Sequence, residues 1–369
     1  MLPLNWQKVR LGDIGKPCMC KRVMKHQTTR YGEIPFYKIG TFGNTADAFI
    51  SKKLFLEYKT KYSFPKKGDI LISASGTIGR AVIYDGKPAY FQDSNIVWID
   101  NDETLVKNDF LFYAYSNVKW NTEHTTILRL YNDNFRNTLI PLPPLNEQSA
   151  IANILGALDR YLCALDALIL KKEGVKKALS FELLSQRKRL KGFNQAWQRV
   201  RLGDIANYLT SNLSVEQITQ QGEIKVYDVN NFIGYTDTTF ISDKPYISIV
   251  KDGSVGRVRI LPPKTNILST MGALIANHRT TTEFLFYLLS NFDFKNFTSG
   301  SIIPHIYFKD YKEKTIFLPP LNEQSTIANI LSALDNEIAS LKNKKRQFEN
   351  IKKALNHDLM SAKIRVLEK

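Results

Sequence analysis

The chain has 369 residues, of which 43% are hydrophobic and 23% are charged. This length predicts two or three domains, and the composition is that of a globular protein rather than a disordered one. The apolar runs fall short of the roughly 18 residues that a membrane-spanning helix needs. We expect no secretory signal at the N-terminus. Three cysteines without CxxC pairs argue against a disulfide framework or a structural zinc site, so we expect a soluble protein of the reducing cytoplasm.

The charge gives the first indication of a partner. Lysine and arginine number 51 against 35 aspartate and glutamate residues, which leaves a net charge of +16 and a pI near 9.5. Such an excess suits a polyanionic partner, and DNA or RNA is the usual one. A basic protein without any such partner can have the same charge. Charge alone therefore leaves both interpretations open.

The chain begins with a segment that returns in its second half. Residues 6–14 recur as residues 197–205, and residues 142–155 recur as residues 318–331, with one exchange in each pair. The first segment repeats after 191 residues and the second after 176, so the stretch between them is 15 residues shorter in the second half. Two long repeats argue against a solenoid. They divide the chain into variable regions and shared regions.

The first variable region, about residues 15–141, is predicted to be a globular domain of mixed α and β structure. It is rich in Tyr, Phe, Ile and Thr with turn residues between them, which is typical of short strands. Residues 69–83 predict a strand, a tight turn at Gly76 and Gly79, and a second strand, because glycine permits positive φ. A helix is expected at residues 109–115.

The first shared segment predicts a long helix that follows Pro144. Proline cannot continue a helix, so we expect Asn146 as the N-cap and Glu147 in the first turn. Apolar residues then recur at three- and four-residue steps over about five heptads, which is typical of a coiled coil. They are Ile151, Leu155, Leu158, Leu162, Leu165, Ile169, Val175, Leu179 and Leu183.

The second half repeats this order of elements. Residues 247–260 predict the same strand, turn and strand, and residues 283–289 repeat the short helix. Asn322 and Glu323 repeat the helix start. The apolar stripe that follows contains Ile327, Leu331, Leu334, Ile338, Leu341, Phe348, Ile351, Leu355 and Leu359.

A single amphipathic helix cannot bury its own stripe. We therefore expect the two long helices to pack on each other within the chain. The alternative is that each helix lies on its own domain. The lysine pairs at 176–177 and 352–353 are predicted to lie on a solvated face.

Several sequence patterns of catalysis are absent. There is no Gly-x-x-x-x-Gly-Lys-Ser/Thr loop, no Asn/Asp-Pro-Pro-aromatic run and no His-Glu-x-x-His, and the glycine pairs in the turns lack the third glycine of a dinucleotide fingerprint. No set of nucleophile, base and orienting residue is evident. We expect a non-catalytic binding protein with no cofactor and no metal site.

Together these features resemble the specificity (S) subunits of Type I restriction–modification systems. The likeness rests on the duplicated Leu-Pro-Pro-Leu-Asn-Glu-Gln before heptads, the duplicated Trp-x-x-Val-Arg-Leu-Gly-Asp-Ile and the Gly-Thr/Ser-Ile/Val-Gly turn, and it covers essentially the whole chain. It implies two globular α+β target recognition domains, residues 1–145 and 193–321. A long antiparallel coiled coil of two helices, residues 146–192 and 322–369, separates them in a pseudo-two-fold repeat.

The resemblance also implies a function. Each target recognition domain reads one half of a split sequence in double-stranded DNA, and the helices set the spacer between the halves. The subunit itself is not catalytic. It positions two DNA adenine methyltransferase (M) subunits, and two ATP-dependent restriction (R) subunits can join them. Two readers related by a two-fold axis predict half-sites about one helical turn apart.

The matching turns supply the first candidate DNA contacts. Arg80 and Arg257 follow the turns and are predicted to contact a phosphate or a guanine edge, since a guanidinium can bond a guanine edge in two places. The alternative is a salt bridge that supports the fold. Thr77 and Ser254 lie at the turn tips, where they either contact phosphate or stabilise the turn.

Further candidates lie in polar segments. Residues 21–30 form a basic loop, and residues 129–136 and 300–309 are predicted loops in equivalent places before the Pro-Pro segments. For each, the alternative is a solvated surface loop. The second variable region shows no clear match to residues 91–95, so its recognition surface is not predicted by analogy. The further predicted DNA contacts are Lys21, Arg22, Lys25, Arg30, Arg129, Asn132, Asn134, Arg136, Asn277, Arg279, His305 and Lys309.

Two other functions fit parts of the sequence. One is a scaffold that dimerises through its helices and binds RNA or protein with its basic domains. Binding to duplex DNA against RNA at matched salt distinguishes it, because non-specific electrostatic binding falls steeply with salt whereas base readout keeps its preference. The other is a nuclease site hidden in one variable region, which magnesium-dependent cleavage by the isolated chain would reveal.

Overall fold

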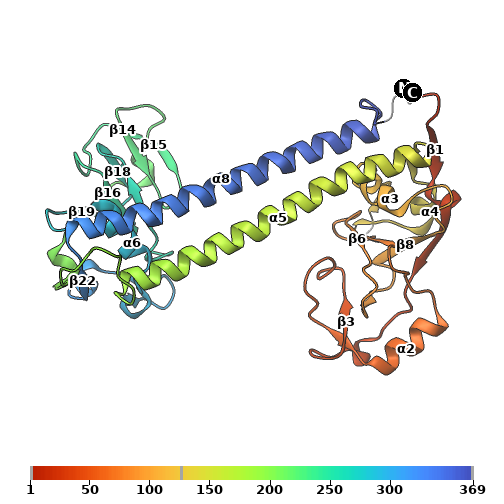
Figure 1. Ribbon diagram of the computed structural model, residues 1–369, viewed down its shortest axis with the longest axis horizontal. Helices are drawn as coiled ribbons and strands as arrows, with labels where there is room; N and C mark the ends of the chain where they lie inside the picture. The colour runs from red at the N-terminus through yellow and green to blue at the C-terminus, as the bar shows by residue number, and fades with distance from the viewer. Residues whose placement is uncertain (1–2, 125–127, 367–369) are drawn as a thin grey trace. The chain divides into compact units, whose positions relative to one another are not determined.

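The computed structural model describes residues 3–124 and 128–366 (Figure 1). It divides into two compact units. Unit 1 joins residues up to Leu165 with those from Lys344 onward, and unit 2 spans Asp166–Asn343. Each unit contains one globular α+β domain, called domain 1 or domain 2, and one half of each of two long helices. None of the helices in the described residues is long and apolar enough to cross a membrane.

Domain 1 has sixteen short elements. They are β1 (Gln7–Arg10), α1 (Leu11–Ile14), β2 (Gly15–Met19), η1 (Lys25–Gln27), β3 (Ile34–Tyr37), β4 (Phe49–Ile50), α2 (Lys52–Lys61), β5 (Ile70–Ser73), β6 (Ala81–Ile83), β7 (Tyr90–Phe91), β8 (Ile96–Asn101), α3 (Asn108–Tyr115), β9 (Glu123–His124), β10 (Leu128–Arg129), α4 (Asn132–Asn137) and β11 (Leu139–Leu142). A four-stranded antiparallel sheet has the order β2-β8-β5-β6, and a three-stranded sheet has the order β4-β3-β7. In the smaller sheet β3 and β7 are parallel.

Domain 2 repeats this topology. Its elements are β12 (Gln198–Arg201), η2 (Leu202–Asp204), β13 (Ala206–Thr210), η3 (Val215–Gln217), β14 (Ile224–Tyr227), β15 (Phe232–Thr236), β16 (Tyr246–Val250), β17 (Val258–Leu261), β18 (Thr265–Ile267), β19 (Met271–Ala276), α6 (Thr282–Ser290), η4 (Lys295–Phe297), β20 (Thr298–Ser299), β21 (His305–Ile306), α7 (Phe308–Tyr311) and β22 (Thr315–Leu318). The sheets have the orders β13-β19-β16-β17 and β15-β14-β18, with β14 and β18 parallel. The shared fold predicted for the two variable regions is therefore confirmed.

The shared segments frame each domain in the same way. β1 pairs with β11 and β12 pairs with β22, both antiparallel, so the start of each repeat is joined to the strand that leads into a long helix. The domains differ between their two sheets. Domain 1 carries the helix α2 there, whereas the corresponding described residues of domain 2, between β15 and β16, form no helix. This difference contributes to the shorter second repeat.

Each domain has two hydrophobic cores. In domain 1, one core lies against the long helices and includes Ile72 and Phe110, and the other lies beneath the small sheet and includes Trp98. Domain 2 has the equivalent pair of cores, with Ile249 in one and Tyr246 in the other. Full burial of one such large side chain stabilises the fold by ~1.5–3 kcal/mol. These cores fix the sheets that carry the turns described below.

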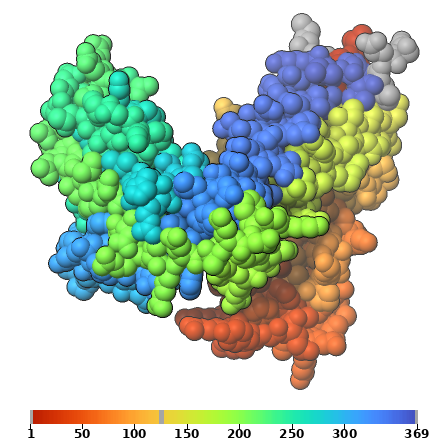
Figure 2. Space-filling model, turned by 60° about the vertical axis from the view of Figure 1, so that its left-hand side comes forward, coloured from red at the N-terminus to blue at the C-terminus, as the bar shows by residue number. Residues whose placement is uncertain are grey.

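The long helices are α5 (Leu145–Leu184) and α8 (Leu321–Met360), each of 40 residues. In unit 1 the first half of α5 packs against the last half of α8, with the rings of Tyr161 and Phe348 4.7 Å apart. In unit 2 the remaining halves pair, and Glu173 lies 2.6 Å from Lys342. The helices are therefore antiparallel within each unit, and in unit 1 their atoms lie against each other (Figure 2).

Both expectations for the apolar stripe hold in part. The helices pack on each other, and each also lies on its own domain: Ile151 and Leu155 join the core of domain 1, and Ile327 and Leu331 join that of domain 2. The predicted stripe is wrong at two matched positions, since Val175 is 46% exposed and Ile351 is 50% exposed.

The prediction for the lysine pairs needs a correction. Lys176 forms an ion pair with Asp335 on the partner helix, and Lys352 does the same with Asp159. The side chain of Lys176 is 30% exposed and that of Lys352 is 26% exposed. Each lies between the helices and a tyrosine ring, Tyr287 for Lys176 and Tyr113 for Lys352. Only the second lysines of the pairs, Lys177 and Lys353, are exposed as predicted.

The predicted helix start is also corrected. Each helix begins one residue before the asparagine, and Asn146 lies inside the first turn. The carbonyl of Pro144 accepts the amide of Gln148 at 2.9 Å, so this proline precedes the first helical residue. The position of Glu147 in the first turn is as predicted.

The two segments before the Pro-Pro motifs, residues 129–136 and 300–309, were predicted to be loops. The structure corrects this prediction. Each contains a short strand followed by a helix of one or two turns, β10 and α4 in domain 1 and β21 and α7 in domain 2. A buried ring anchors each helix, Phe135 in α4 and Tyr311 in α7. An acidic residue in each first turn, Asp133 or Asp310, stabilises the helix by its interaction with the positive end of the helix dipole.

Candidate nucleic-acid interface

The two predicted turns have matching geometry. Gly76 and Gly79 have φ of +66° and +83°, and Gly253 and Gly256 have +82° and +80°, which favours glycine over any other residue. A side chain at Gly79 would clash with the indole of Trp120, and one at Gly256 would clash with the ring of Phe294. The turns are thus fixed by the same constraints in both domains.

Three segments of domain 1 converge beside its turn. The amide of Ala74 donates to the carbonyl of Asn95 at 2.7 Å, and the carbonyl of Ala74 accepts the amide of Leu130 at 2.9 Å. The side chains then meet. Oδ1 of Asn95 accepts hydrogen bonds from the Ser75 hydroxyl at 2.8 Å and from the Arg129 guanidinium at 3.2 Å. We call Ser75, Asn95 and Arg129 turn cluster 1.

Domain 2 repeats the backbone bonds with different side chains. The amide of Lys251 donates to the carbonyl of Thr270 at 3.1 Å, and the carbonyl of Lys251 accepts the amide of Ile306 at 2.9 Å. Nδ1 of His305 lies 2.6 Å from Oδ1 of Asp252. We call Asp252, Thr270 and His305 turn cluster 2. Its three positions are the structural equivalents of those in turn cluster 1.

This equivalence supplies the match that the sequence did not show. Asn95 and Thr270 make the same backbone bond, and each follows a short parallel strand, β7 or β18. Residues 268–270 therefore correspond to residues 92–95, with one residue fewer. The surface around turn cluster 2 can therefore be compared with that around turn cluster 1.

A basic pocket of about 500 Å³ adjoins turn cluster 1. Its polar lining residues are Arg22, Lys25, Thr28, Lys38, Gln92, Asp93, Ser94, Asn95 and Arg129. Nε of Arg22 lies 2.8 Å from Oδ2 of Asp93, and the Arg22 side chain is 67% exposed. The Asp93 carboxylate is only 14% exposed and positions Arg22, whose other guanidinium hydrogens remain available to a phosphate. Three predicted contacts, Arg22, Lys25 and Arg129, are brought together here.

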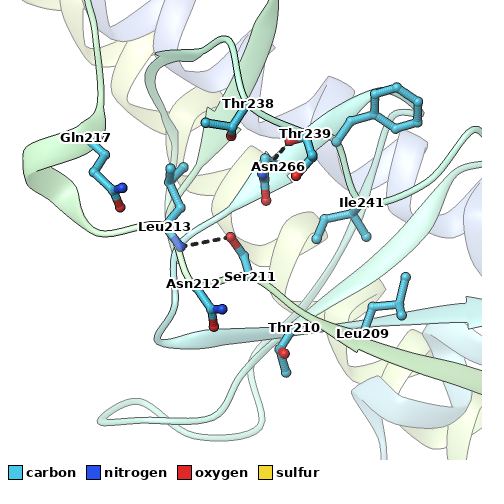
Figure 3. Close-up of a pocket in the computed structure, with 11 residues that line it drawn as sticks. Leu209, Thr210, Ser211, Asn212, Leu213, Gln217, Thr238, Thr239, Ile241 and Asn266 are labelled. Atoms are coloured by element: carbon cyan, nitrogen blue, oxygen red, sulfur yellow. Dashed lines mark hydrogen bonds between the residues drawn. The ribbon is translucent and has the colours of Figure 1, made fainter.

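Domain 2 has an uncharged pocket of about 370 Å³ in a different place (Figure 3). The Ser211 hydroxyl accepts the amide of Leu213 at 3.1 Å, and the amide group of Asn266 donates to the carbonyl of Thr239 at 2.6 Å. None of the predicted contact residues lines this pocket. Its only sequence signal is the run of Thr, Ser and Asn at residues 210–212, which is also typical of a turn.

The residues that follow and cap the turns have mixed outcomes. Arg80 donates to the carbonyl of Phe42 at 2.9 Å, so it supports the fold, although through a backbone group and not through the salt bridge that was the alternative. Arg257 is exposed, and its guanidinium has no hydrogen bond or ion pair among the described residues. Thr77 and Ser254 are exposed at the turn tips, as expected.

The remaining candidates of domain 1 do not line the basic pocket. Lys21 holds its ammonium group 5.1 Å above the ring of Tyr62, and Arg30 is exposed. Asn132, Asn134 and Arg136 lie on α4. The roles of these residues as DNA contacts stay predictions.

The candidates of domain 2 outside turn cluster 2 have structural contacts. Asn277 donates to the carbonyl of Asp204 at 2.9 Å and accepts the amide of Arg279 at 3.0 Å. The carbonyl of Arg279 accepts a bond from Gln324 at the start of α8. Lys309 on α7 lies 5.5 Å from the ring centre of Tyr307. Asn277 and Arg279 therefore support the helix junction, and the structure does not bring them to turn cluster 2.

Two titratable groups bear on the chemistry available in these domains. Burial raises the pKa of the Cys20 thiol to about 12, so this group is protonated at neutral pH and is a poor nucleophile. Burial and, to a lesser extent, the Asp252 carboxylate raise the pKa of Tyr208. Within the described residues, no three His, Cys, Asp or Glu side chains are grouped so that they could hold a metal ion.

The comparisons with known proteins agree on one family. The model of the Type I restriction modification DNA specificity domain matches residues 3–172 and again residues 194–350. A Haemophilus influenzae protein, whose name assigns it to the type I restriction enzyme specificity subunits, is 64% identical over 152 residues. That match spans 41% of this chain and 40% of the relative. The MjaVIII specificity subunit of Methanocaldococcus jannaschii is 25% identical over 409 residues, which cover 99% of this chain and 94% of that protein.

Solved structures show the same fold. The S subunit of a Type I restriction–modification system from M. genitalium superposes with a TM-score of 0.64 at 20% identity, over 97% of this chain and 98% of that one. A chain from a structure that describes complex assembly of the type I system has a TM-score of 0.58 at 16% identity, over 99% of this chain and 100% of that one.

Proposed function

The chain belongs to the Type I restriction–modification DNA specificity family and is a specificity subunit with two copies of the family's domain. From this premise we propose that its two domains read different halves of one split sequence in double-stranded DNA. Domain 1 lies within residues 1–145 and domain 2 within residues 193–321. The methyl transfer and any cleavage belong to partner subunits.

One observation carries this proposal. The two domains hold three backbone positions in the same hydrogen-bonded arrangement beside the same glycine turn, yet they place different side chains there. A constant scaffold with variable polar groups is what two readers of different base sequences require, because sequence is read by hydrogen bonds to base edges. The basic pocket of domain 1 adds groups that can contact phosphates, which position a protein on the duplex without reading sequence.

The proposed role of the helices is to set the spacer between the half-sites. Ion pairs and rings join α5 to α8 in both units, for example Lys172 to Glu337 at 2.8 Å in unit 2. A pair of packed helices is stiffer than a single helix. We therefore propose that the length of the pair fixes the distance between the two domains, and with it the number of base pairs between the half-sites.

The proposed docking sites for the methyltransferase subunits are two equivalent grooves. In unit 1 a groove lies where α3 meets the helices, at Ser116, Asn117 and Lys352. In unit 2 the groove beside α6 contains Ser290 and Asn291 with the matching lysine. The exposed apolar residues Val175 and Ile351 also occupy matched positions. Two repeats of one surface fit two copies of one partner, and two restriction subunits can join such an assembly.

The test is a genome-wide map of N6-methyladenine in the source cell, with and without this gene. We expect methylation at one split, asymmetric motif to disappear on deletion and to return with a plasmid copy. If no motif changes, the chain is purified with any methyltransferase that copurifies with it. Random DNA duplexes are then selected for binding to this preparation. Failure to enrich a split sequence there would overturn the proposal.

A further inference from the structure

We infer that the two domains read bases through opposite hydrogen-bonding chemistry: turn cluster 1 presents donors, whereas the Asp252–His305 pair of turn cluster 2 presents an acceptor. This inference rests on the proposed function and goes further, because it names the class of base that each domain selects. It follows from which atoms of the clusters are already bonded within the protein and which are left over.

In turn cluster 1 the acceptor is used internally. The guanidinium of Arg129 can only donate, so the Asn95 atom that faces it must be the amide oxygen. That oxygen also accepts the hydroxyl of Ser75. Among the described residues, the Asn95 NH₂ group and the Nε and Nη1 groups of Arg129 have no partner. Ser75 itself is only 6% exposed. The groups left for a ligand are therefore donors.

In turn cluster 2 the bonding is reversed. The Asp252 carboxylate can only accept, so Nδ1 of His305 carries the hydrogen of their 2.6 Å bond. Oδ2 of Asp252 has no partner within the described part of the chain, and neither has Nε2 of His305. The free carboxylate oxygen is an acceptor whichever protonation state the imidazole has. The side chains of Asp252 and His305 are 30% and 35% exposed, so both reach the surface.

Base edges in the major groove complement these groups. Guanine presents two acceptors, N7 and O6, which suit a forked pair of Arg129 donors formed by the second hydrogen of Nη2 with Nη1 or Nε. Cytosine and adenine present amino groups, which suit a carboxylate such as Asp252. We therefore assign a guanine to the half-site of domain 1. The half-site of domain 2 is assigned a cytosine or adenine that is read through its amino group.

The first experiment transfers the side chains of turn cluster 2 to domain 1 in the intact chain. S75D/N95T/R129H places the side chains of turn cluster 2 in domain 1, and the chromosomal gene is replaced by this variant before methylation is mapped. We expect the half-site of domain 1 to change while the other half and the spacer stay the same. T60S, at an exposed residue of α2 whose hydroxyl bonds to carbonyls of its own helix, is the matched control and should leave the motif unchanged.

Two gentler variants keep the test decisive if the triple exchange unfolds the domain. R129Q removes the forked donor, and D252N keeps the shape of the side chain but turns the free acceptor into a donor. We expect R129Q to relax the guanine position and D252N to change the base in the other half-site. Methylation of the unaltered motif by both variants overturns this inference and leaves the proposed function intact. If the wild-type chain neither directs methylation of any motif nor enriches a split sequence from random duplexes, the proposed function is overturned instead.

The second experiment removes single acceptors from the DNA. With the complex purified from the source cell, 7-deazaguanine at the assigned position lacks N7 and should weaken binding roughly 10-fold or more. Inosine lacks only the minor-groove amino group and should bind like guanine. R129Q should abolish the penalty for 7-deazaguanine. An equal penalty in R129Q and wild type would show that Arg129 does not read this base.

Discussion

A buried glutamine ties each long helix to its domain. Oε1 of Gln148 accepts the amide of Lys107 at 2.8 Å, and its NH₂ group donates to the carbonyls of Leu105 and Pro143, both at 2.9 Å. Gln324 makes the same set of bonds in unit 2, and both side chains are fully buried. These bonds give the glutamine of the repeated segment the same structural role in both units.

We predict that Q148L and Q324L each destabilise the corresponding unit by about 3 kcal/mol or more. Each variant removes the partner of three backbone groups, one in a buried bond and two in part-buried bonds, and a buried group left unpaired costs about 1–3 kcal/mol. Urea unfolding of the full chain measures the effect by tryptophan fluorescence, to which Trp6, Trp98 and Trp120 contribute in unit 1 and Trp197 in unit 2.

The controls for this prediction are S149A and S325A. These exposed hydroxyls bond only to the preceding turn of their own helix. Their removal should change stability by less than about 0.5 kcal/mol. Glutamine variants that unfold at the same urea concentration as these controls would show that the buried amide is dispensable.

At the scale of single residues, the sequence located some of the site but not its bonding. Arg129 and His305 were predicted as contacts because they are polar residues in matched segments. Ser75 and Asn95 were not, since their convergence with Arg129 depends on three segments that are far apart in the chain. The partner of Gln148 was hidden for the same reason: two short helices and three short strands, from α3 to β11, separate Lys107 from it in the chain.

At the scale of elements, a tyrosine of each domain anchors the helix pair. In unit 2 the hydroxyl of Tyr287 on α6 donates to Oδ2 of Asp335 at 2.8 Å, and Lys176 pairs with the other carboxylate oxygen. Burial, followed by the Asp335 carboxylate, raises the pKa of Tyr287, so the phenol stays protonated. Unit 1 has the equivalent contacts of Tyr113 and Asp159.

We predict that D335K destabilises unit 2 by about 2–3 kcal/mol, because it removes the bond of Tyr287 to a charged acceptor and places a lysine beside Lys176. The double variant K176D/D335K restores an ion pair and should recover about 1 kcal/mol or less, since both side chains are about one-third exposed. Urea unfolding measures both. K177D, at the exposed neighbouring lysine, is the control; a double variant no more stable than D335K would contradict the assignment of this ion pair.

The long elements were predictable and the short ones were not. A stripe that continues for about five heptads predicts a helix reliably. A helix as short as α7, Phe308–Tyr311, shows no period, and its existence depends on the burial of Tyr311 in the core. The position of Lys176 between the helices was missed because a lysine next to an apolar stripe is usually solvated.

At the scale of the whole molecule, the proposed spacer role makes a quantitative prediction. One heptad is inserted into both helices where the units meet in the chain, between Leu165 and Asp166 in α5 and between Asn343 and Lys344 in α8. A heptad preserves the apolar stripe and adds about 10.5 Å at 1.5 Å per residue. Since base pairs rise about 3.4 Å each, we expect the methylated motif to keep both half-sites and to gain about three base pairs of spacer.

The control is the same heptad inserted into α5 alone. It shifts one helix against the other and breaks contacts on one side of the insertion, such as the pair of Glu173 and Lys342 in unit 2. We expect this variant to lose methylation instead of acquiring a new spacer. A double insertion that methylates the original motif would show that the helices do not measure the spacer. The half-sites would then have to be positioned by the partner subunits, with the helices serving only to hold the two domains in one chain.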